Sequence, residues 1–122
     1  MNNFKNLIKR GYVIQVDFGT QVGSVQSNKR PAVVIQNDIG NKYSPNTIVV
    51  PLTSKHKKSM PTHFKLDKEK YDYLHTDSLA ICEQIITISK GQIKECLGYI
   101  DKDDIVQIEK RLAISMGLTL VG

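Results

Sequence analysis

Two short segments of the chain carry side chains that suit chemistry on a phosphodiester. Arg30 stands directly before Pro31 and an apolar run at 32–35, and Thr53 follows a second apolar run at 47–52. If these runs pair as neighbouring strands, Arg30 and Thr53 come together at the rim of a small sheet. A guanidinium matches phosphate oxygens bidentately, and a hydroxyl can donate a hydrogen bond to another oxygen of the same group. The pair therefore suits metal-free RNA cleavage, in which the neighbouring 2′-hydroxyl attacks phosphorus.

The group that would take the 2′-hydroxyl proton stays open, because an arginine is a poor base at neutral pH. Histidine is the usual candidate for such proton transfer. His63 lies in an alternating stretch, His56 belongs to the basic run 55–58, and His75 follows a turn, so we expect all three at the surface. The run 55–58 is either a solvated loop or a basic stripe that steers RNA. No His-x-x-His, Cys-x-x-Cys or clustered carboxylate pattern occurs, so we expect neither a metal nor a cofactor.

Size and charge bound the class of protein. The 122 residues have room for one domain, 1–122, with residues 1–8 as a flexible start. A net charge of +5 favours an anionic partner. The apolar runs are shorter than the roughly 20 residues that cross a bilayer, so we expect a cytoplasmic protein without a membrane partner. Cys82 and Cys96 follow no metal-ligand spacing and are expected as buried, reduced thiols.

Alternation and apolar runs predict a mostly β structure. Residues 12–18 alternate as a half-buried strand, whereas 32–35 and 48–50 are continuous apolar runs, typical of strands covered on both faces. Further segments are assigned from alternation and turn formers: strands at 62–66, 78–88 and 93–100, a turn or one helical turn at 89–92, a surface loop at 19–30 and turns at 37–46.

The last element is predicted as a helix. Asp101 is a good N-cap, and Gly117 can end the helix. Between them, apolar side chains recur at helical spacing: Ile105, Ile108, Leu112 and Met116. The sequence thus predicts a compact, mostly antiparallel barrel closed by one amphipathic C-terminal helix.

Several short motifs are distributed along residues 9–118. They are Gly11-Tyr12-Val13 with Asp17, Gly23-Ser24-Val25-Gln26, Arg30-Pro31, Ile35-Gln36-Asn37-Asp38, Ser44-Pro45, Pro61-Thr62-His63 and Glu83-Gln84-Ile85. In these motifs the chain resembles the MazF/PemK family of toxin endoribonucleases from type II toxin-antitoxin systems, and its Gram-positive branch in particular.

The resemblance implies a fold, an activity and partners. The fold is mostly β with α, an SH3-like antiparallel barrel of the CcdB/MazF type with a C-terminal helix. The activity is sequence-specific, metal-independent cleavage of single-stranded RNA (mRNA) by a homodimer, inhibited by a MazE-like antitoxin with an acidic C-terminal segment. The family's catalytic residues correspond to Arg30 and Thr53, and its RNA-binding residues correspond to Ser24, Asn37, Ser54, Glu83 and Gln84.

Two departures from the family pattern keep alternatives open. Val25 stands where the family often has Glu, and Ile86 stands where relatives often have Arg. Valine cannot transfer a proton, so a catalytically impaired nucleic-acid-binding barrel is one alternative. The other is a gyrase-poisoning toxin like CcdB, although this chain has no Trp and its end lacks the pattern associated with gyrase contact.

Overall fold

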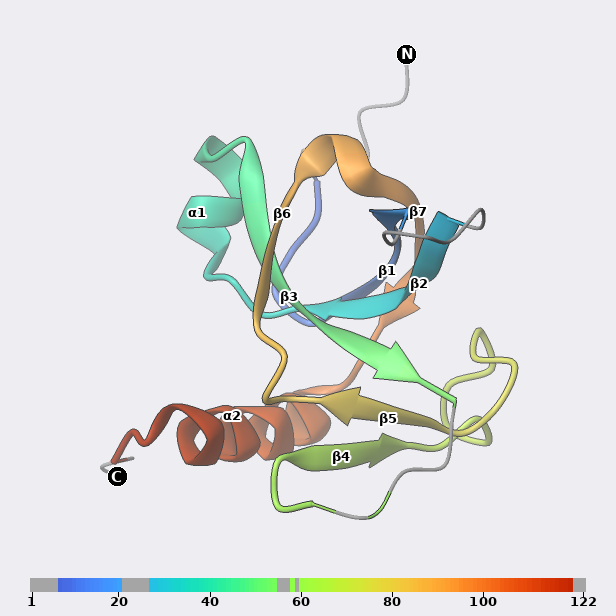
Figure 1. Cartoon of the computed structure of the whole chain (residues 1–122), viewed down its shortest axis with the longest axis vertical. Coiled ribbons are helices and arrows are strands. Elements are labelled where there is room, and N and C mark those ends of the chain that lie inside the picture. Colours follow the sequence, from blue (N-terminus) through green and yellow to red (C-terminus); the bar gives the residue numbers. More distant parts are fainter. Residues whose placement is uncertain (1–6, 21–26, 55–57, 59, 120–122) are drawn as a thin grey trace.

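Seven antiparallel strands and two α-helices make up the part of the chain that the computed structural model describes, residues 7–20, 27–54, 58 and 60–119 (Figure 1). The elements follow in the order β1 (Tyr12–Thr20), β2 (Ser27–Val34), α1 (Asp38–Tyr43), β3 (Asn46–Thr53), β4 (His63–Leu66), β5 (Ser78–Ile81), β6 (Ile86–Ser89), the 3₁₀ turn η2 (Lys90–Gln92), β7 (Ile93–Tyr99) and α2 (Lys102–Met116).

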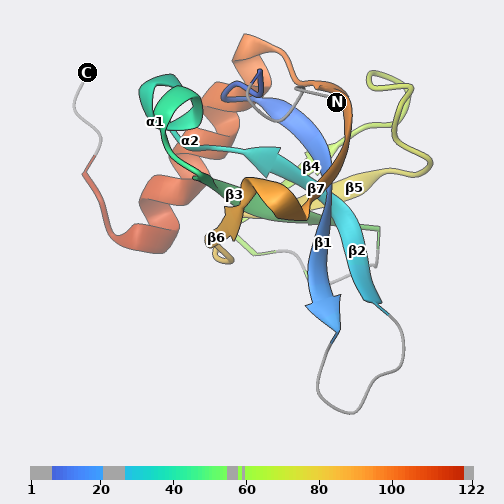
Figure 2. The ribbon, with the colours of Figure 1, turned by 90° about the horizontal axis from the view of Figure 1, so that it is seen from above.

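The strands are ordered β4-β5-β3-β2-β1-β7, and β6 pairs with β3. Along one edge β3 pairs with β2, and along the other it pairs first with β6 and then with β5. The five strands β6-β3-β2-β1-β7, with η2 between the two outer ones, have the connectivity of an SH3-like barrel, and the pairings of the described residues leave the sheet open. The prediction of a mostly antiparallel β fold with a C-terminal helix is confirmed. Figure 2 shows β1 and β2 side by side, extending away from both helices.

Both faces of β1, β2 and β3 are covered by apolar side chains. One face carries Ile14, Val16, Ala32, Val34 and Val49, which pack against Ile88 and Ile93 inside the five-stranded part. The other face carries Val13, Val33, Val50 and Leu52, which pack against β4, β5 and α2. The continuous apolar runs at 32–35 and 48–50 are explained by this double coverage. The strand at 12–18 is buried on both faces at Val13 and Ile14, more than its alternation predicts.

The C-terminal helix begins and ends where the sequence predicts. The carboxylate of Asp101 accepts a hydrogen bond from the backbone N–H of Asp104, and Gly117 ends the helix with φ +68°. Ile108 and Leu112 are buried, whereas Met116 is exposed. Two side chains bind the helix to the strands beside it: Arg111 donates to the carbonyl of His63, and Ser115 donates to the carbonyl of Cys82.

Three sequence expectations about the connections are corrected. The predicted turns at 37–46 contain α1, because Asn37 caps it by accepting from the N–H of Gly40 at 2.8 Å. Residues 19–20 and 27–30 of the predicted loop belong to strands, since β1 runs to Thr20 and β2 begins at Ser27, and the rest of that segment lies outside the described residues. The strand predicted at 78–88 is two strands, β5 and β6, separated by a turn in which Gln84 N–H bonds to the carbonyl of Ile81. The helical turn expected at 89–92 is present as η2.

Two side chains lie in surroundings other than those predicted. His63 was expected to face solvent, but it is buried because Glu83 and β5 cover it. Cys96 is exposed, since β7 is an end strand of the sheet, whereas Cys82 is buried as predicted. Burial raises the pKa of the Cys82 thiol to about 12, so it stays protonated. Neither cysteine forms a disulfide. Within the described residues, no helix is both long and apolar enough to cross a membrane.

Candidate functional site

A cavity of about 540 Å³ lies where the start of β2 and the end of β3 meet the connection between β4 and β5. Three of the residues singled out from the sequence line it: Arg30 on β2, Thr53 at the end of β3 and Ser54 directly after it. The fold thus brings the predicted cation and the predicted hydroxyl to one cavity.

The strand register explains why these residues meet. β2 and β3 pair through Ala32 with Pro51, Val33 with Val50 and Val34 with Val49. The last of these pairs, Ala32 with Pro51, is two residues away from both Arg30 and Thr53. Each of the two is also held by a further strand, since Arg30 pairs with Val16 of β1 and Thr53 pairs with Leu79 of β5. Arg30 is therefore fixed by its pairing with β1, and Thr53 by its pairing with β5.

A cross-strand row forms the floor of the cavity. Gln15 on β1 is directly opposite Pro31 on one side and Glu95 of β7 on the other, and all three residues line the cavity. Residues directly opposite one another in antiparallel strands project from the same face. Arg30 pairs with Val16, the residue after Gln15, so its side chain projects from the opposite face of the sheet to this row.

The connection between β4 and β5 forms the opposite wall, with Tyr73, Leu74, His75 and Thr76 lining the cavity. Tyr71 anchors this wall: its hydroxyl donates to the carboxylate of Asp104 and accepts from the N–H of Asp101. Burial, followed by the bond to Asp104, raises the pKa of Tyr71 to about 12. The hydroxyl of Tyr73 donates to the carbonyl of Tyr99 at 3.0 Å, so the wall is tied to β7 as well as to α2.

The cavity combines positive charge with groups that transfer protons. Lys29 and Arg30 supply two cations, and the Nε of Arg30 donates to the side-chain oxygen of Asn28 at 3.0 Å, which orients the guanidinium. Glu95 on β7 and His75 on the β4–β5 connection are exposed residues that also line the cavity. Such a site can hold a phosphodiester on its cations and exchange protons with the groups around it.

Comparison with known proteins identifies the family. Residues 9–116 match the model of the PemK-like, MazF-like toxin of type II toxin-antitoxin systems. The chain belongs to this family.

Solved structures of two endoribonucleases and of a MazE–MazF complex share the fold. The chain is 23% identical to an endoribonuclease from a mycobacterial species, with a TM-score of 0.77 over 98% of this chain and 100% of the other. A mycobacterial endoribonuclease in complex with its cognate antitoxin is 23% identical, with a TM-score of 0.75 over 93% and 99%. The MazE–MazF complex from Deinococcus radiodurans is 17% identical, with a TM-score of 0.75 over 92% and 98%.

The other residues that the MazF/PemK resemblance assigns to RNA binding do not line the cavity. Asn37 caps α1, which lies apart from the β4–β5 connection in Figure 1. Glu83 and Gln84 lie in the turn between β5 and β6, and both are exposed. Ser24, together with Val25 and Gln26 of the same motif, lies outside the described residues, as do residues 55–57 of the predicted basic run.

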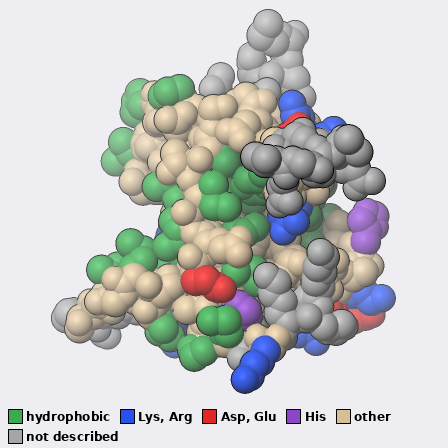
Figure 3. All heavy atoms as spheres, viewed as in Figure 1, with side chains coloured by type: hydrophobic (Ala, Val, Ile, Leu, Met, Phe, Trp, Pro, Cys, Tyr) green, Lys and Arg blue, Asp and Glu red, His purple; other side chains and the backbone are tan. Residues whose placement is uncertain are grey.

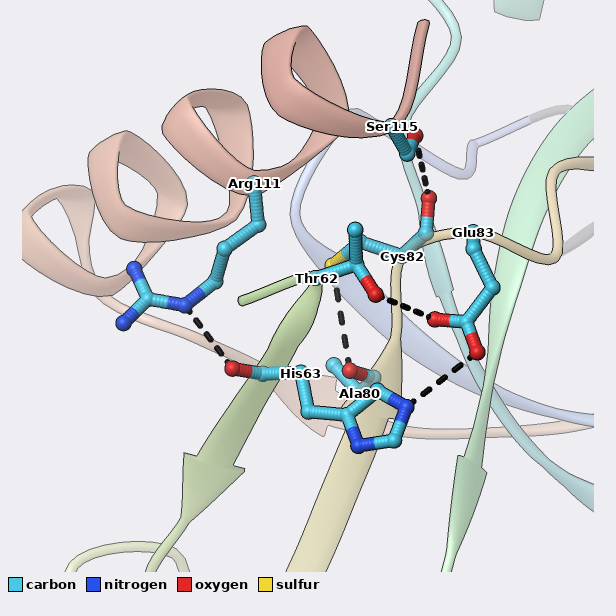
Figure 4. Close-up of polar contacts among 7 residues, drawn as sticks. All are labelled: Thr62, His63, Ala80, Cys82, Glu83, Arg111 and Ser115. Atoms are coloured by element: carbon cyan, nitrogen blue, oxygen red, sulfur yellow. Dashed lines mark hydrogen bonds and ion pairs between the residues drawn. The ribbon is translucent and has the colours of Figure 1, made fainter. Parts of the chain in front are cut away.

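Glu83 is fixed in place by two side chains at the start of β4 (Figure 4). One carboxylate oxygen accepts from the hydroxyl of Thr62 at 2.7 Å, and the other lies 3.2 Å from Nε2 of His63. Partial burial raises the pKa of the Glu83 carboxyl, but the hydrogen bonds from Thr62 and His63 outweigh this effect and hold the pKa below its usual range. With a side chain 34% exposed, Glu83 is an ionised and oriented acceptor at the surface.

Six further residues that line the cavity were not among the predicted site residues: Gln15, Lys29, Tyr73, His75, Thr76 and Glu95. No local sequence pattern distinguishes Gln15 and Glu95 from other polar strand residues. Their shared position follows only from the pairing of β1 with β7. His75 is of a residue type that can transfer protons, but it follows a turn and is predicted to lie at the surface. Among the described residues, no group of three or more His, Cys, Asp or Glu side chains is arranged to hold a metal ion.

Proposed function

We propose that this MazF/PemK-family protein is an endoribonuclease toxin that cleaves single-stranded RNA, including mRNA, at the cavity lined by Arg30 and Thr53 without a metal ion. The observation that carries the proposal is the shared cavity of these two residues, which come from different strands. The family match favours this activity over gyrase poisoning. An mRNA substrate sets the site of action in the cytoplasm.

Cleavage begins when the 2′-hydroxyl oxygen attacks the adjacent phosphorus and breaks the bond to the 5′-oxygen, leaving a 2′,3′-cyclic phosphate and a 5′-hydroxyl. Arg30 stabilises the negative charge that builds up on the nonbridging oxygens of the phosphorane. The Thr53 hydroxyl donates a hydrogen bond to a nonbridging or leaving oxygen. Because strand pairing fixes both positions, little reorganisation is needed at the moment of reaction.

RNA binding extends beyond the cavity in this proposal. Ser54 lies in the cavity, while Ser24, Asn37, Glu83 and Gln84 hold neighbouring nucleotides. The oriented Glu83 carboxylate supports such a role, because it can accept hydrogen bonds from the donor edge of an unpaired base. In Figure 3, basic side chains lie mainly on the half of the face that carries β2 and the β4–β5 connection, which suits a bound phosphate backbone.

A second copy of the chain and an antitoxin are the protein partners that we propose. Exposed apolar side chains support a homodimer: Ile39 and Tyr43 on α1, Ile85 before β6, and Ile114, Met116 and Leu118 at the end of α2. Figure 3 shows apolar side chains over the α1 side and the α2 end of the same face. A MazE-like antitoxin with an acidic C-terminal segment suits the net charge of +5.

The test is incubation of the purified protein with a mixed single-stranded RNA in EDTA. Cleavage to products with a 5′-hydroxyl, abolished by Arg30→Ala in a folded variant, supports the proposal. Arrest of DNA gyrase without RNA cleavage would instead identify a CcdB-like poison. A salt-sensitive mobility shift without cleavage would identify a nucleic-acid-binding module.

A further inference from the structure

We infer that Thr62 and His63 are positioning residues that hold the Glu83 carboxylate ready to select one RNA base, and that the selected base carries an amino group. The inference rests on the proposed RNA cleavage and deepens it, because it names what sets part of the sequence specificity. Adenine, cytosine and guanine carry such a group, whereas uracil does not.

The two positioning side chains are buried and act through Glu83. Thr62 and His63 each have 8% of their surface exposed, so neither presents its side chain to a base. The Thr62 hydroxyl donates to one carboxylate oxygen at 2.7 Å, and Nε2 of His63 lies 3.2 Å from the other (Figure 4). An ionised carboxylate only accepts hydrogen bonds, so Nε2 carries the proton of this contact. One donor on each oxygen fixes the orientation of the carboxylate.

The imidazole of His63 is explained better by this contact than by filling of the core. Its side chain is 4% exposed, and its Nδ1 is buried without a hydrogen-bond partner among the described residues. A buried nitrogen left unpaired destabilises the fold, and an apolar side chain in the same place would avoid this. Within the described part of the chain, the ring bonds to Glu83 alone. The ring is therefore suited to orienting that carboxylate.

The backbone on both sides of this contact is also held in place. The N–H of Cys82, the residue before Glu83, donates to the carbonyl of Thr62 at 3.0 Å. From α2, the Nε of Arg111 donates to the carbonyl of His63 at 2.9 Å. The two donors and the acceptor thus stand on one frame, and the carboxylate needs little further ordering when a base binds.

Glu83 is attached to the strand that carries Thr53. β5 pairs with β3 at Leu52 and Thr53, and β6 pairs with β3 up to Val49. Glu83 lies in the turn between β5 and β6, so both ends of its turn are attached to β3. The attachment points Val49 and Leu52 are three residues apart, about 10 Å along the strand. The base that Glu83 selects therefore belongs to a nucleotide near the cleaved one.

The chemistry of an ionised carboxylate decides which bases it accepts. Glu83 can accept hydrogen bonds but cannot donate one. The amino groups of adenine, cytosine and guanine donate, whereas the N3–H of uracil lies between two carbonyl oxygens that a carboxylate repels. A carboxylate therefore selects against uracil, and a selective base contact is worth roughly 10- to 100-fold.

The experiment measures base preference by sequencing the products of a random pool of single-stranded RNA cleaved in EDTA. Glu83→Gln, whose amide can also donate, should admit uracil at one position, which the wild type disfavours by roughly 10- to 100-fold. Thr62→Val and His63→Leu each remove one donor and should relax the preference at the same position. His63→Gln, whose amide N–H can replace Nε2–H, should keep most of it.

Two comparisons separate positioning from a loss of stability. In a double-mutant cycle, Thr62→Val should change the preference of Glu83→Gln less than that of the wild type, because it acts through Glu83. Thr47→Val is the matched control, since the Thr47 hydroxyl is also buried and donates to a side chain, the amide oxygen of Asn41, at 2.6 Å. This control should lower the unfolding temperature without changing the base preference.

Each outcome bears on the inference. A Glu83→Gln variant with the base preferences of the wild type would overturn the inference and leave the proposed endoribonuclease standing. If Glu83→Gln relaxes a position that folded Thr62→Val and His63→Leu leave unchanged, neither residue positions Glu83 and the inference is wrong. A wild-type protein that cleaves no RNA would overturn the proposed function and this inference together.

Discussion

Arg30 and Thr53 each lie two residues beyond the pair that joins Ala32 of β2 to Pro51 of β3, and both line the cavity. The relationship is fixed on both outer sides, because Val16 pairs with Arg30 and Leu79 pairs with Thr53. A change in either side chain therefore alters the chemistry of the cavity more than the position of its backbone.

Replacement of Arg30 by alanine should lower the cleavage rate by at least about 10²- to 10³-fold, the usual cost of removing one preorganised charge donor to a transition state. Arg30→Lys should recover only part of the rate, because an ammonium keeps the charge but not the bidentate fork. The measurement is the initial rate on a labelled single-stranded RNA. Thermal unfolding followed by circular dichroism checks that the fold survives. Full activity of folded Arg30→Ala would remove Arg30 from the mechanism.

The apolar centres of β2 and β3 could be predicted because their signals are local, whereas Arg30 itself fell in the segment predicted as a loop. Continuous apolar runs at 32–35 and 48–50 indicate strands covered on both faces, and the structure covers them with two apolar clusters. The helix ends could be predicted for the same reason, since Asp101 and Gly117 are caps that act within one turn.

The rest of the cavity depends on pairings that no local pattern contains. Glu95 reaches the floor only through the register of β1 with β7, which has two irregularities. His63 alternates like a surface strand residue, yet Glu83 and the covering elements bury it. The strand was predicted correctly, but the prediction that His63 faces solvent was wrong, because its side chain is only 4% exposed. This burial comes from tertiary packing, which the local sequence does not contain.

Replacement of Lys29 by alanine should weaken RNA binding through charge alone. Lys29 lines the cavity beside Arg30, and each phosphate contact on a single strand contributes about −0.7 to the slope of log affinity against log salt concentration. The slope for a 2′-O-methylated RNA should therefore become shallower by about 0.7 in Lys29→Ala. Lys110→Ala, which removes an exposed lysine of α2 outside the cavity, should leave the slope unchanged. Equal slopes for the wild type, Lys29→Ala and Lys110→Ala would show that Lys29 makes no phosphate contact.

Replacement of Gly98 by alanine should displace the ring of Tyr73, which lines the cavity. A Cβ at Gly98 would lie 2.6 Å from Cε2 of Tyr73, so the ring that lines the cavity must move. We expect a loss of about 1–3 kcal/mol in the free energy of unfolding, the typical cost of overpacking, together with slower RNA cleavage. Gly91→Ala is the control, because its Cβ would meet its nearest neighbour at an ordinary 3.6 Å. The measurements are urea unfolding and the initial cleavage rate, and a Gly98→Ala variant indistinguishable from Gly91→Ala would contradict the prediction.

Acid should weaken the contact between the β4–β5 connection and α2. The ammonium of Lys70 lies 2.7 Å from the carboxylate of Asp101 and 3.1 Å from that of Asp104. The hydrogen bond from Lys70, and next the one from the Asp104 backbone, hold the pKa of Asp101 below its usual value of 3.8. The unfolded chain therefore binds more protons than the folded one as the pH falls below that value. This part of the stability is present above about pH 4 and is lost as the pH falls through the lower folded pKa.

Asp101→Asn isolates the charge in this contact. Asparagine caps a helix about as well as aspartate, so the bond to the Asp104 N–H is kept while the ion pair with Lys70 is lost. The variant should be less stable than the wild type at pH 7 and should lose less stability between pH 5 and pH 2. Urea unfolding at a series of pH values measures both effects. The ion pair is exposed, so about 0.5 M salt should shrink the difference at pH 7. If the two proteins lose stability in parallel as the pH falls, Asp101 does not carry the acid sensitivity of this contact.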